Sequence, residues 1–325
     1  MKALVYTGTM QTEFREEPHP VTSDGEIIVK LSHCGICGSD MHAWHGHDER
    51  RIPPLILGHE AVGIAQSGKF KDQRVAINPL MTNGTSEFCL SGNEHLCPSR
   101  ELIGMRVPGA FAEAVAIKEE NLFALPDHLS FDEAALAEPL AVCVHAARLG
   151  LARTGPDNTS AIALGGGAIG LLTALVLNHY GIKSVQIAET NELRRKMLSE
   201  VTPAKPYNPI DDTPSEQVDL VLDCVGSGIT RKSASNLVKP GGTIIHVGLQ
   251  DNEPGLDTRR ITLQEIAFIG TYCYTNADFQ EALDLLADGS ISRQGWSEIR
   301  PLSEGGSGFE DIHNGRAVPK IILEI

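Results

Sequence analysis

The chain has 325 residues and a mass of 35.0 kDa, a length that suggests two domains. With 27 Lys and Arg residues against 42 Asp and Glu residues its net charge is −15, which argues against nucleic-acid binding because phosphates repel a negative surface. A hydrophobic fraction of 42% excludes a disordered chain, and seven cysteines, an odd number, argue against a closed disulfide framework.

Neither a targeting segment nor a membrane span is expected. The first residues form too short an apolar run for a signal peptide. The longest apolar stretch, residues 161–177, is shorter than the ~20 residues that a membrane helix needs, and glycines interrupt it. We therefore expect a cytoplasmic protein with neither nucleic acid nor membrane as a partner.

The first half of the chain has the pattern of an antiparallel, barrel-like domain. Short apolar runs rich in β-branched residues alternate with turn signals such as Asp24-Gly25 and Pro53-Pro54. The strands expected there are residues 3–6, 26–32, 74–77 and 111–117.

From about residue 145 the pattern changes, and apolar strands alternate with helical stretches. Such an alternation predicts a doubly wound parallel sheet. The expected strands are residues 160–164, 184–188, 218–224, 243–247 and 266–269, and the expected helices are residues 168–180 and 191–200.

The last fifty residues change again. Phe279, Ala282, Leu283 and Leu286 have the spacing of one helical face, and glycine-rich loops and a final strand at 319–325 are expected after it. We expect this tail to return to the first domain. The predicted domains are therefore residues 1–143 with 276–325, and residues 144–275.

A glycine fingerprint predicts a dinucleotide site. Gly165, Gly167 and Gly170 fit G-x-G-x-x-G, after an apolar strand and at the start of a helix. These glycines permit a tight turn, close approach of a pyrophosphate, and close packing of helix on strand. Glu189 ends the next strand 19 residues after Gly170, where an acidic residue binds the ribose hydroxyls and repels a 2′-phosphate. The pattern therefore favours NAD over NADP.

The alternative interpretation is a glycine turn in an α/β domain that binds no nucleotide. Arg194 and Arg195 are candidates for a 2′-phosphate contact, but a solvated helix face is the simpler interpretation of both. The candidate cofactor-binding residues are Gly165, Gly167, Ile169, Gly170, Glu189, Arg194 and Val225.

A second cluster of residues suggests a catalytic metal. Cys34 to His42 contains two cysteines and a histidine, His59-Glu60 follows, and Glu138 comes later. Thiolate, imidazole and carboxylate are the ligand types of zinc, and a catalytic zinc uses about three of them plus a water. Cys37, His59 and a carboxylate would provide such a set.

With these motifs the chain resembles the zinc-dependent medium-chain dehydrogenase/reductase family, and within it the polyol branch of sorbitol and L-idonate dehydrogenases. The matching runs are residues 34–42, 58–60, 109–113 and 138–142 and the glycine fingerprint, in this order along the whole chain. The resemblance implies an α/β fold in which a GroES-like β-barrel catalytic domain is interrupted by a Rossmann domain.

The resemblance also implies roles for individual residues. Cys37, His59 and Glu60 resemble the ligands of one catalytic zinc per chain. Glu138 is similar to the acid that holds the zinc-bound water or binds the metal in relatives, and which glutamate ligates at rest stays open.

Further roles concern proton transfer and the substrate. Ser39 resembles the first member of a proton relay beside the substrate oxygen, and His42 its distal base. Asp40 is placed to orient His59. The candidate substrate contacts are Ser39, Glu138 and Tyr272.

Where relatives bind a structural zinc with four thiolates, this chain has Asn83, Ser86, Cys89 and Cys97. Two thiolates do not close such a site, so we expect no structural zinc. Whether Cys89 and Cys97 pair or stay free is left open. The other cysteines are interpreted as packing residues.

Two further departures concern the substrate. Sorbitol dehydrogenases tend to have Arg where this chain has Thr271, and Tyr where it has Ala43. Both changes remove groups that bind a polyol, which argues against sorbitol itself. The resemblance implies a homodimer or a homotetramer.

Together these features predict an enzyme that transfers hydride between NAD and a secondary alcohol, in a polyol, sugar or sugar acid. Two alternatives are a non-catalytic NAD-binding sensor or structural subunit, and a zinc-independent quinone or enoyl reductase. Neither would need Cys37, Ser39, His42, His59 and Glu138 together.

Overall fold

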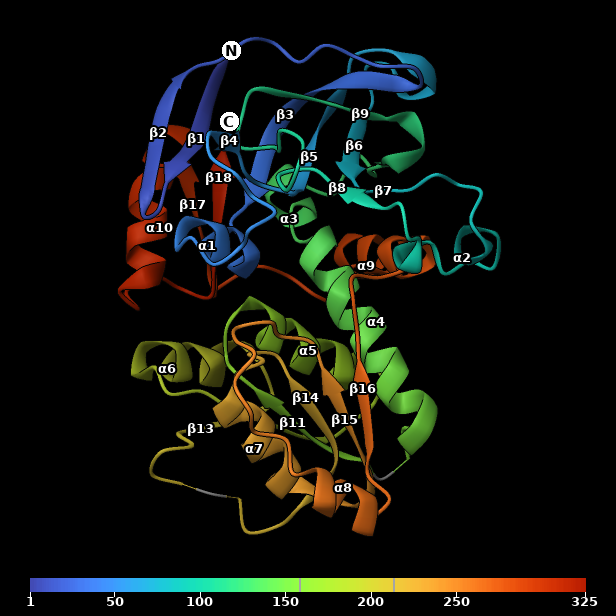
Figure 1. Ribbon diagram of the computed structural model, residues 1–325, viewed down its shortest axis with the longest axis vertical. Helices are drawn as coiled ribbons and strands as arrows, with labels where there is room; N and C mark the ends of the chain where they lie inside the picture. Colours follow the sequence, from blue (N-terminus) through green and yellow to red (C-terminus); the bar gives the residue numbers. More distant parts are fainter. Residues whose placement is uncertain (158, 213) are drawn as a thin grey trace. The chain divides into compact units, whose positions relative to one another are not determined.

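The structure, a computed structural model, describes residues 1–157, 159–212 and 214–325. Contacts between residues divide the chain into two units. The first contains residues 1–141, 275–293 and 297–325, and the second contains residues 142–274 and 294–296. Figure 1 labels the elements of both.

The first unit is built from mostly antiparallel sheets. A three-stranded sheet has the order β2-β1-β4, a larger one has the order β10-β6-β5-β3-β18-β17 with β9 also paired to β3, and β7 pairs with β8. The strands are β1 (Lys2–Gly8), β2 (Gln11–Glu16), β3 (Glu26–Gly35), β4 (Leu55–Ile56), β5 (Glu60–Ala65), β6 (Arg74–Ile77), β7 (Leu80–Met81), β8 (Glu101–Leu102), β9 (Ala114–Lys118), β10 (Leu122–Ala124), β17 (Ser297–Pro301) and β18 (Lys320–Glu324).

The long strand β3 organises this unit, because β5, β9 and β18 all pair with it in antiparallel register. Helices are short apart from two: α1 (Gly38–Trp44), α2 (Glu87–Leu90), α3 (Phe131–Ala134), α9 (Asn276–Ala287) and α10 (Gly305–His313). The strand expected over 111–117 begins only at Ala114. The barrel-like first domain predicted from the sequence is confirmed.

Helix α10 is the main difference from the sequence prediction, which placed glycine-rich loops there. Its glycines are needed for close packing rather than for turning. A Cβ atom on Gly305 would lie 2.4 Å from Leu4, and one on Gly308 would lie 3.2 Å from Ile36. With Phe309 buried beside them, these glycines bring the helix backbone against the barrel core.

The second unit is a six-stranded parallel sheet of order β13-β12-β11-β14-β15-β16, the strand order of a Rossmann fold (Figure 1). Its strands are β11 (Ser160–Leu164), β12 (Ser184–Ala188), β13 (Lys205–Tyr207), β14 (Val218–Asp223), β15 (Val238–His246) and β16 (Ala267–Gly270). Helices α5 (Ala168–His179), α6 (Glu192–Val201), α7 (Gly228–Leu237) and α8 (Thr258–Leu263) accompany them, and α4 (Ala137–Thr154) precedes them. The predicted doubly wound sheet is confirmed.

The strand order reverses between β11 and β14, where a Rossmann sheet binds its nucleotide. The apolar run 161–177 consists of strand β11, a glycine turn and helix α5. Among the described residues no helix is long and apolar enough to cross a membrane.

Candidate active site

Cys37 is fixed by its position at the start of helix α1. Its Sγ accepts the backbone N–H of Ser39 at 3.5 Å, and its own N–H donates to Oδ2 of Asp40 at 3.0 Å. This reciprocal pair of bonds is a capping box, in which the usual hydroxyl is replaced by a thiol. The helix start therefore holds Cys37 and Ser39 close together, with Gly38 between them in the chain.

His59 is held by the buried carboxylate of Asp40, whose Oδ1 lies 3.5 Å from Nδ1 of the imidazole. The same oxygen accepts the N–H of Gly58 at 3.3 Å. Burial alone would raise the pKa of Asp40, but the charges of His59 and Arg51 lower it, so the carboxylate stays ionised. Asp40 thus lies beside His59, and its predicted role in orienting the imidazole stays a prediction.

Gly58 is needed at this point because its φ is 90° and a Cβ atom would lie 2.5 Å from the ring of Phe111. The tight turn brings His59 and Glu60 to the start of β5.

Ligand atoms of Cys37, His59 and Glu60 all lie within 4.8 Å of one another. Within the described part of the chain, no other group of three or more Cys, His, Asp and Glu residues is that compact. A thiolate, an imidazole and a carboxylate fit zinc, and three protein ligands leave a coordination position for water or substrate. The arrangement therefore fits a catalytic zinc.

Glu60 has a second partner that the sequence analysis missed. Nζ of Lys320 lies 2.7 and 2.6 Å from the two carboxylate oxygens of Glu60 and donates to the carbonyl of Ile36 at 3.0 Å. Burial would lower the pKa of Lys320, but the carboxylate of Glu60 raises it. A lysine within the apolar run of the last strand was the available signal, since such a charge needs a buried partner.

Glu138 is buried in the first turn of α4, outside the compact Cys37–His59–Glu60 group. Its charge contributes to the raised pKa of Lys320. The predicted fourth metal-site residue therefore acts on the same lysine as Glu60.

Ser39 lies beside the metal-site histidine, with its Oγ 3.5 Å from Nε2 of His59. Arg51, a buried residue that the sequence analysis did not single out, donates to this hydroxyl at 3.2 Å and to the backbone carbonyls of Ser39 and Gly104. A 2.6 Å ion pair with Asp48 balances the guanidinium charge. Because a guanidinium only donates, Oγ of Ser39 is the acceptor, and its own proton is available to another group.

His42 is half-buried and lies three residues after Ser39 on α1. Burial and the neighbouring His47 lower its pKa, although Asp48 raises it. The imidazole is therefore neutral at pH 7 and able to accept a proton.

The glycine fingerprint forms the turn between β11 and α5. Gly165 has a φ of 97°, and a Cβ on Gly170 would lie 1.7 Å from the carbonyl oxygen of Gly165. Gly167 is the N-cap of α5, and a Cβ there would meet nothing within 4 Å. Ile169 follows within the first turn of the helix. Open space at a helix N-terminus fits a pyrophosphate.

Glu189 follows β12 and folds back on this turn. Its carboxylate accepts the N–H of Gly166 at 2.8 Å and that of Asn191 at 2.7 Å. Arg194 and Arg195 are half-buried, and the interpretation of both as part of a solvated helix face stays a prediction. Arg195 donates to the carbonyls of Glu189 and Thr190 and so holds this turn.

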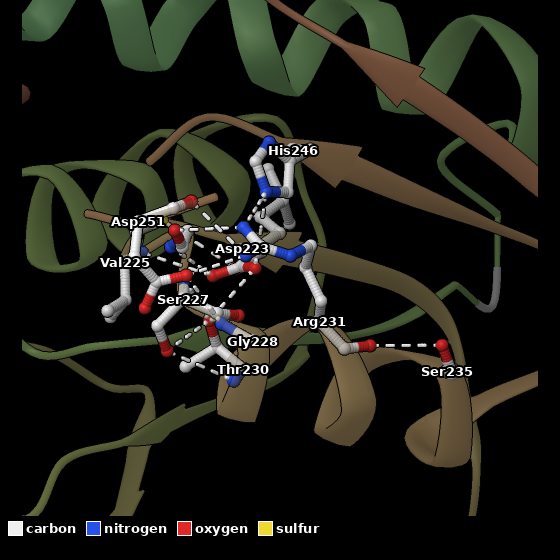
Figure 2. A network of polar contacts seen from close by, with 12 residues as sticks. Asp223, Val225, Ser227, Gly228, Thr230, Arg231, Ser235, His246 and Asp251 are labelled. Carbon is white, nitrogen blue, oxygen red and sulfur yellow. Dashed lines mark hydrogen bonds and ion pairs between the residues drawn. The ribbon is translucent and has the colours of Figure 1, made fainter. Parts of the chain in front are cut away.

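A polar network at the ends of β14 and β15 holds the loop that contains Val225 (Figure 2). The fully buried Asp223 accepts the N–H groups of Val225 and Gly226, at 3.2 and 2.8 Å, and the hydroxyl of Thr230 at 3.0 Å. A Cβ on Gly165 would meet Val225 at 2.6 Å, so this loop touches the fingerprint turn. Asp223 was not predicted from the sequence, although an acidic residue that ends an apolar strand was the available signal.

Tyr272 follows β16 in the second unit and is half-buried. Its predicted role as a substrate contact stays a prediction.

Comparisons with known proteins agree with this geometry. The alcohol dehydrogenase GroES-like domain matches residues 23–127, and the zinc-binding dehydrogenase domain matches residues 168–288. The chain is 30% identical to 2-dehydro-3-deoxy-L-galactonate 5-dehydrogenase of Pseudoalteromonas atlantica, over 100% of this chain and 98% of that protein. It is 31% identical to sorbitol dehydrogenase of Bacillus subtilis, over 90% of this chain and 87% of the relative.

Among solved structures, galactitol-1-phosphate dehydrogenase from Escherichia coli superposes with a TM-score of 0.90 at 25% identity, over 100% of both chains. These relatives are dehydrogenases, which favours the predicted enzyme over a non-catalytic NAD-binding protein. The compact Cys37–His59–Glu60 group argues in the same way against a zinc-independent reductase. The chain therefore belongs to the zinc- and NAD-dependent medium-chain dehydrogenase/reductase family, in its polyol branch.

Proposed function

We propose that this chain oxidises a secondary alcohol of a polyol, sugar or sugar acid to a ketone with NAD, reversibly. One observation carries the proposal. The ligand atoms of Cys37, His59 and Glu60 lie within 4.8 Å of one another, and the hydroxyl of Ser39 lies 3.5 Å from Nε2 of His59. Metal ligands and a proton-transferring hydroxyl are thus side by side.

Cys37, His59 and Glu60 would hold the zinc, with Glu138 as the alternative carboxylate. When bound, zinc would supply Lewis-acid polarisation of the substrate oxygen, and NAD would supply the hydride acceptor. Asp40 keeps the imidazole of His59 in one orientation by its contact with Nδ1.

Ser39 and His42 would carry the substrate proton away. Ser39 receives the proton of the substrate hydroxyl at Oγ and gives up its own. Arg51 fixes the direction of this transfer, because its donation at 3.2 Å holds Oγ of Ser39 in place as an acceptor. His42 is neutral at pH 7 and accepts the proton on its way to solvent.

The nucleotide would bind at the fingerprint turn in the second unit. N–H groups at the start of α5, including that of Ile169, would contact the pyrophosphate. The carboxylate of Glu189, which accepts the N–H of Gly166, would accept the ribose hydroxyls and exclude a 2′-phosphate. Arg194, Val225 and Tyr272 complete the proposed nucleotide and substrate contacts.

The substrate class rests on the relatives and on two departures from sorbitol dehydrogenases. The relatives act on a sugar acid, on sorbitol and on a sugar-alcohol phosphate, according to their names. Thr271 and Ala43 stand where sorbitol dehydrogenases tend to have Arg and Tyr, which argues for a substrate other than sorbitol. We further infer a homodimer or homotetramer in the cytoplasm, and light scattering would measure its mass.

The proposal is tested by an NAD-linked screen of polyols, aldonates and their ketones, with zinc content measured on the same sample. We expect about one zinc per chain and turnover with at least one member of the panel. Full activity in a zinc-free preparation would overturn the metal mechanism. NAD binding without turnover on the whole panel would overturn the enzymatic proposal.

A further inference from the structure

The segment from residue 83 to residue 97 brings together the side chains of Asn83, Ser86, Cys89 and Cys97. This set has only two thiols, which are too few for a structural zinc. Oδ1 of Asn83 lies 3.7 Å from Sγ of Cys89 and 3.4 Å from Sγ of Cys97. Oγ of Ser86 lies 3.1 Å from Sγ of Cys89. The two sulfurs therefore share one amide oxygen as a common neighbour.

Short elements hold this arrangement. Ser86 is the N-cap of α2, and its hydroxyl accepts the N–H of Cys89 at 3.2 Å. Cys97 follows the 3-10 helix Glu94–Leu96, to which its N–H is bonded at 3.0 Å. Helix α2 and this 3-10 helix pack on each other. Cys89 therefore lies within α2 and Cys97 directly after the 3-10 helix, and these two elements are in contact.

The two cysteines differ in a way that suits sequential chemistry. Cys97 is fully buried, whereas Cys89 is half-buried and reachable from solvent. The backbone N–H of Asn83 and the hydroxyls of Ser99 and Ser86 lower the pKa of Cys97 to about 6. A solvent-accessible sulfur and a buried sulfur beside the same amide oxygen fit an attacking cysteine and a resolving cysteine.

We propose that Cys89 and Cys97 form a reversible disulfide within the chain when the protein meets a hydroperoxide. Sγ of Cys89 attacks the peroxide, so that an S–O bond forms, the O–O bond breaks, and an alcohol or water leaves. The thiolate of Cys97 then attacks the sulfenic sulfur of Cys89. The S–S bond forms, the S–O bond breaks, and hydroxide leaves and takes up from solvent the proton that Cys97 had given up, whereas the proton of Cys89 has gone to the alcohol or water of the first step.

This step is balanced. The two cysteines lose two electrons and two protons in total, and the hydroperoxide gains them as an alcohol and a water. A dithiol reverses the reaction by exchange. The bond would close a loop of residues 89–97 and cross-link a segment that has Asn83 and Ser86 where relatives bind a structural zinc with thiolates.

Peptide mapping of the full-length, zinc-loaded protein tests the proposal. Reduced protein is treated with hydrogen peroxide, alkylated, and digested with trypsin and a glutamate-specific protease. No Lys or Arg lies between residues 75 and 99, and Glu94 separates the two cysteines. We expect the two glutamate-cleaved peptides to stay linked after oxidation and to separate after dithiothreitol.

Variants assign the steps. Cys97→Ser should accumulate a sulfenic acid at Cys89 that reacts with dimedone, whereas Cys89→Ser should form neither product. Cys273→Ser, which alters a half-buried cysteine elsewhere, should form the linked peptides like the wild type. Oxidised wild-type protein whose peptides separate, or pair with other cysteines, would overturn the proposal. A second zinc per chain that is lost in Cys97→Ser would assign the pair to a metal instead.

Discussion

Lys320 donates to both carboxylate oxygens of Glu60, at 2.7 and 2.6 Å, and both side chains are buried. One residue of the pair starts strand β5 and the other starts β18, 260 residues later in the chain. Glu60 is also one of the three residues whose ligand atoms converge. We therefore expect the lysine and a metal ion to compete for the same carboxylate.

Replacing Lys320 by Met should destabilise the metal-free protein and raise its affinity for zinc. Loss of one partner leaves a buried carboxylate uncompensated, which costs about 3–5 kcal/mol in the free energy of unfolding. Zinc should restore much of this loss, because Glu60 is then free to ligate. Urea unfolding with and without zinc, and chelator competition, measure both effects. Lys320→Arg is the control that keeps the positive charge. Equal zinc affinity of the wild type, Lys320→Met and Lys320→Arg would contradict the competition.

Replacing Cys37 by Ala should remove the zinc and abolish turnover while NAD binding stays nearly unchanged. The thiolate is one of three converging ligands, whereas the fingerprint turn of Gly165 belongs to the second unit. Elemental analysis measures the zinc content of the variant, and fluorescence titration with NADH measures its affinity for the nucleotide. Cys34→Ala, at a buried cysteine outside the ligand group, serves as a control that should keep its zinc. Retained zinc in Cys37→Ala would contradict the assignment.

Ser39→Ala should lower kcat by about 10²–10⁴-fold, the usual contribution of a positioned proton-transfer group. Zinc content should not change, because Ser39 is not among the converging ligands. Ser39→Thr keeps the hydroxyl and should keep most of the activity. Steady-state kinetics over pH, with zinc measured on each variant, provide the test. Similar kcat values for the alanine and threonine variants would exclude the hydroxyl from proton transfer.

Glu189→Ala should weaken NAD binding and reduce the preference for NAD over NADP by about tenfold or more. A good carboxylate–hydroxyl contact is worth ~1.5–3 kcal/mol, and the loss of its charge removes the repulsion of a 2′-phosphate. Glu192→Ala, an exposed residue at the start of α6, is the control for a change in surface charge alone. Isothermal titration with both nucleotides measures the ratio, and an unchanged ratio in Glu189→Ala would contradict the ribose contact.

Acid should weaken the first unit through Asp48. Burial alone would raise the pKa of this carboxyl, but hydrogen bonds from Arg50 and the charge of Arg51 lower it from 3.8 to about 2. Because the pKa is lower in the folded state, the ion pair stabilises the fold above about pH 4, and this stabilisation is lost as the pH falls from 4 to 2. In Asp48→Asn the slope of the unfolding free energy against pH should be smaller between pH 4 and pH 2, and a slope equal to that of the wild type would contradict the assignment.

Local signals made much of this molecule predictable from its sequence. The alternation of strands and helices after residue 145 and the glycines around Gly165 depend on neighbours within about thirty residues. Glu189 was proposed as a ribose contact in the same way, from its spacing after Gly170. Cys37 and His59, whose ligand atoms converge in the structure, were proposed as zinc ligands from their residue types and from the resemblance to a family.

Residues that act through distant contacts were not predictable in this way. Lys320 pairs with Glu60, and Arg51 donates to Ser39, only because the folded barrel brings these residues together. No spacing rule in the sequence connects either pair. Helix α10 was missed for a different reason. Gly305 and Gly308 favour a loop by propensity, and only close packing against Leu4 and Ile36 explains a helix there.

The place of strand β18 has a consequence for the order of folding during synthesis. β18 pairs with both β3 and β17, and its first residue neutralises Glu60. On the ribosome, the parallel sheet of residues 160–270 is complete before this strand has been made. In the nascent chain the nucleotide domain can therefore fold while the amino-terminal barrel is incomplete, and Glu60 lacks its lysine partner until Lys320 has been synthesised.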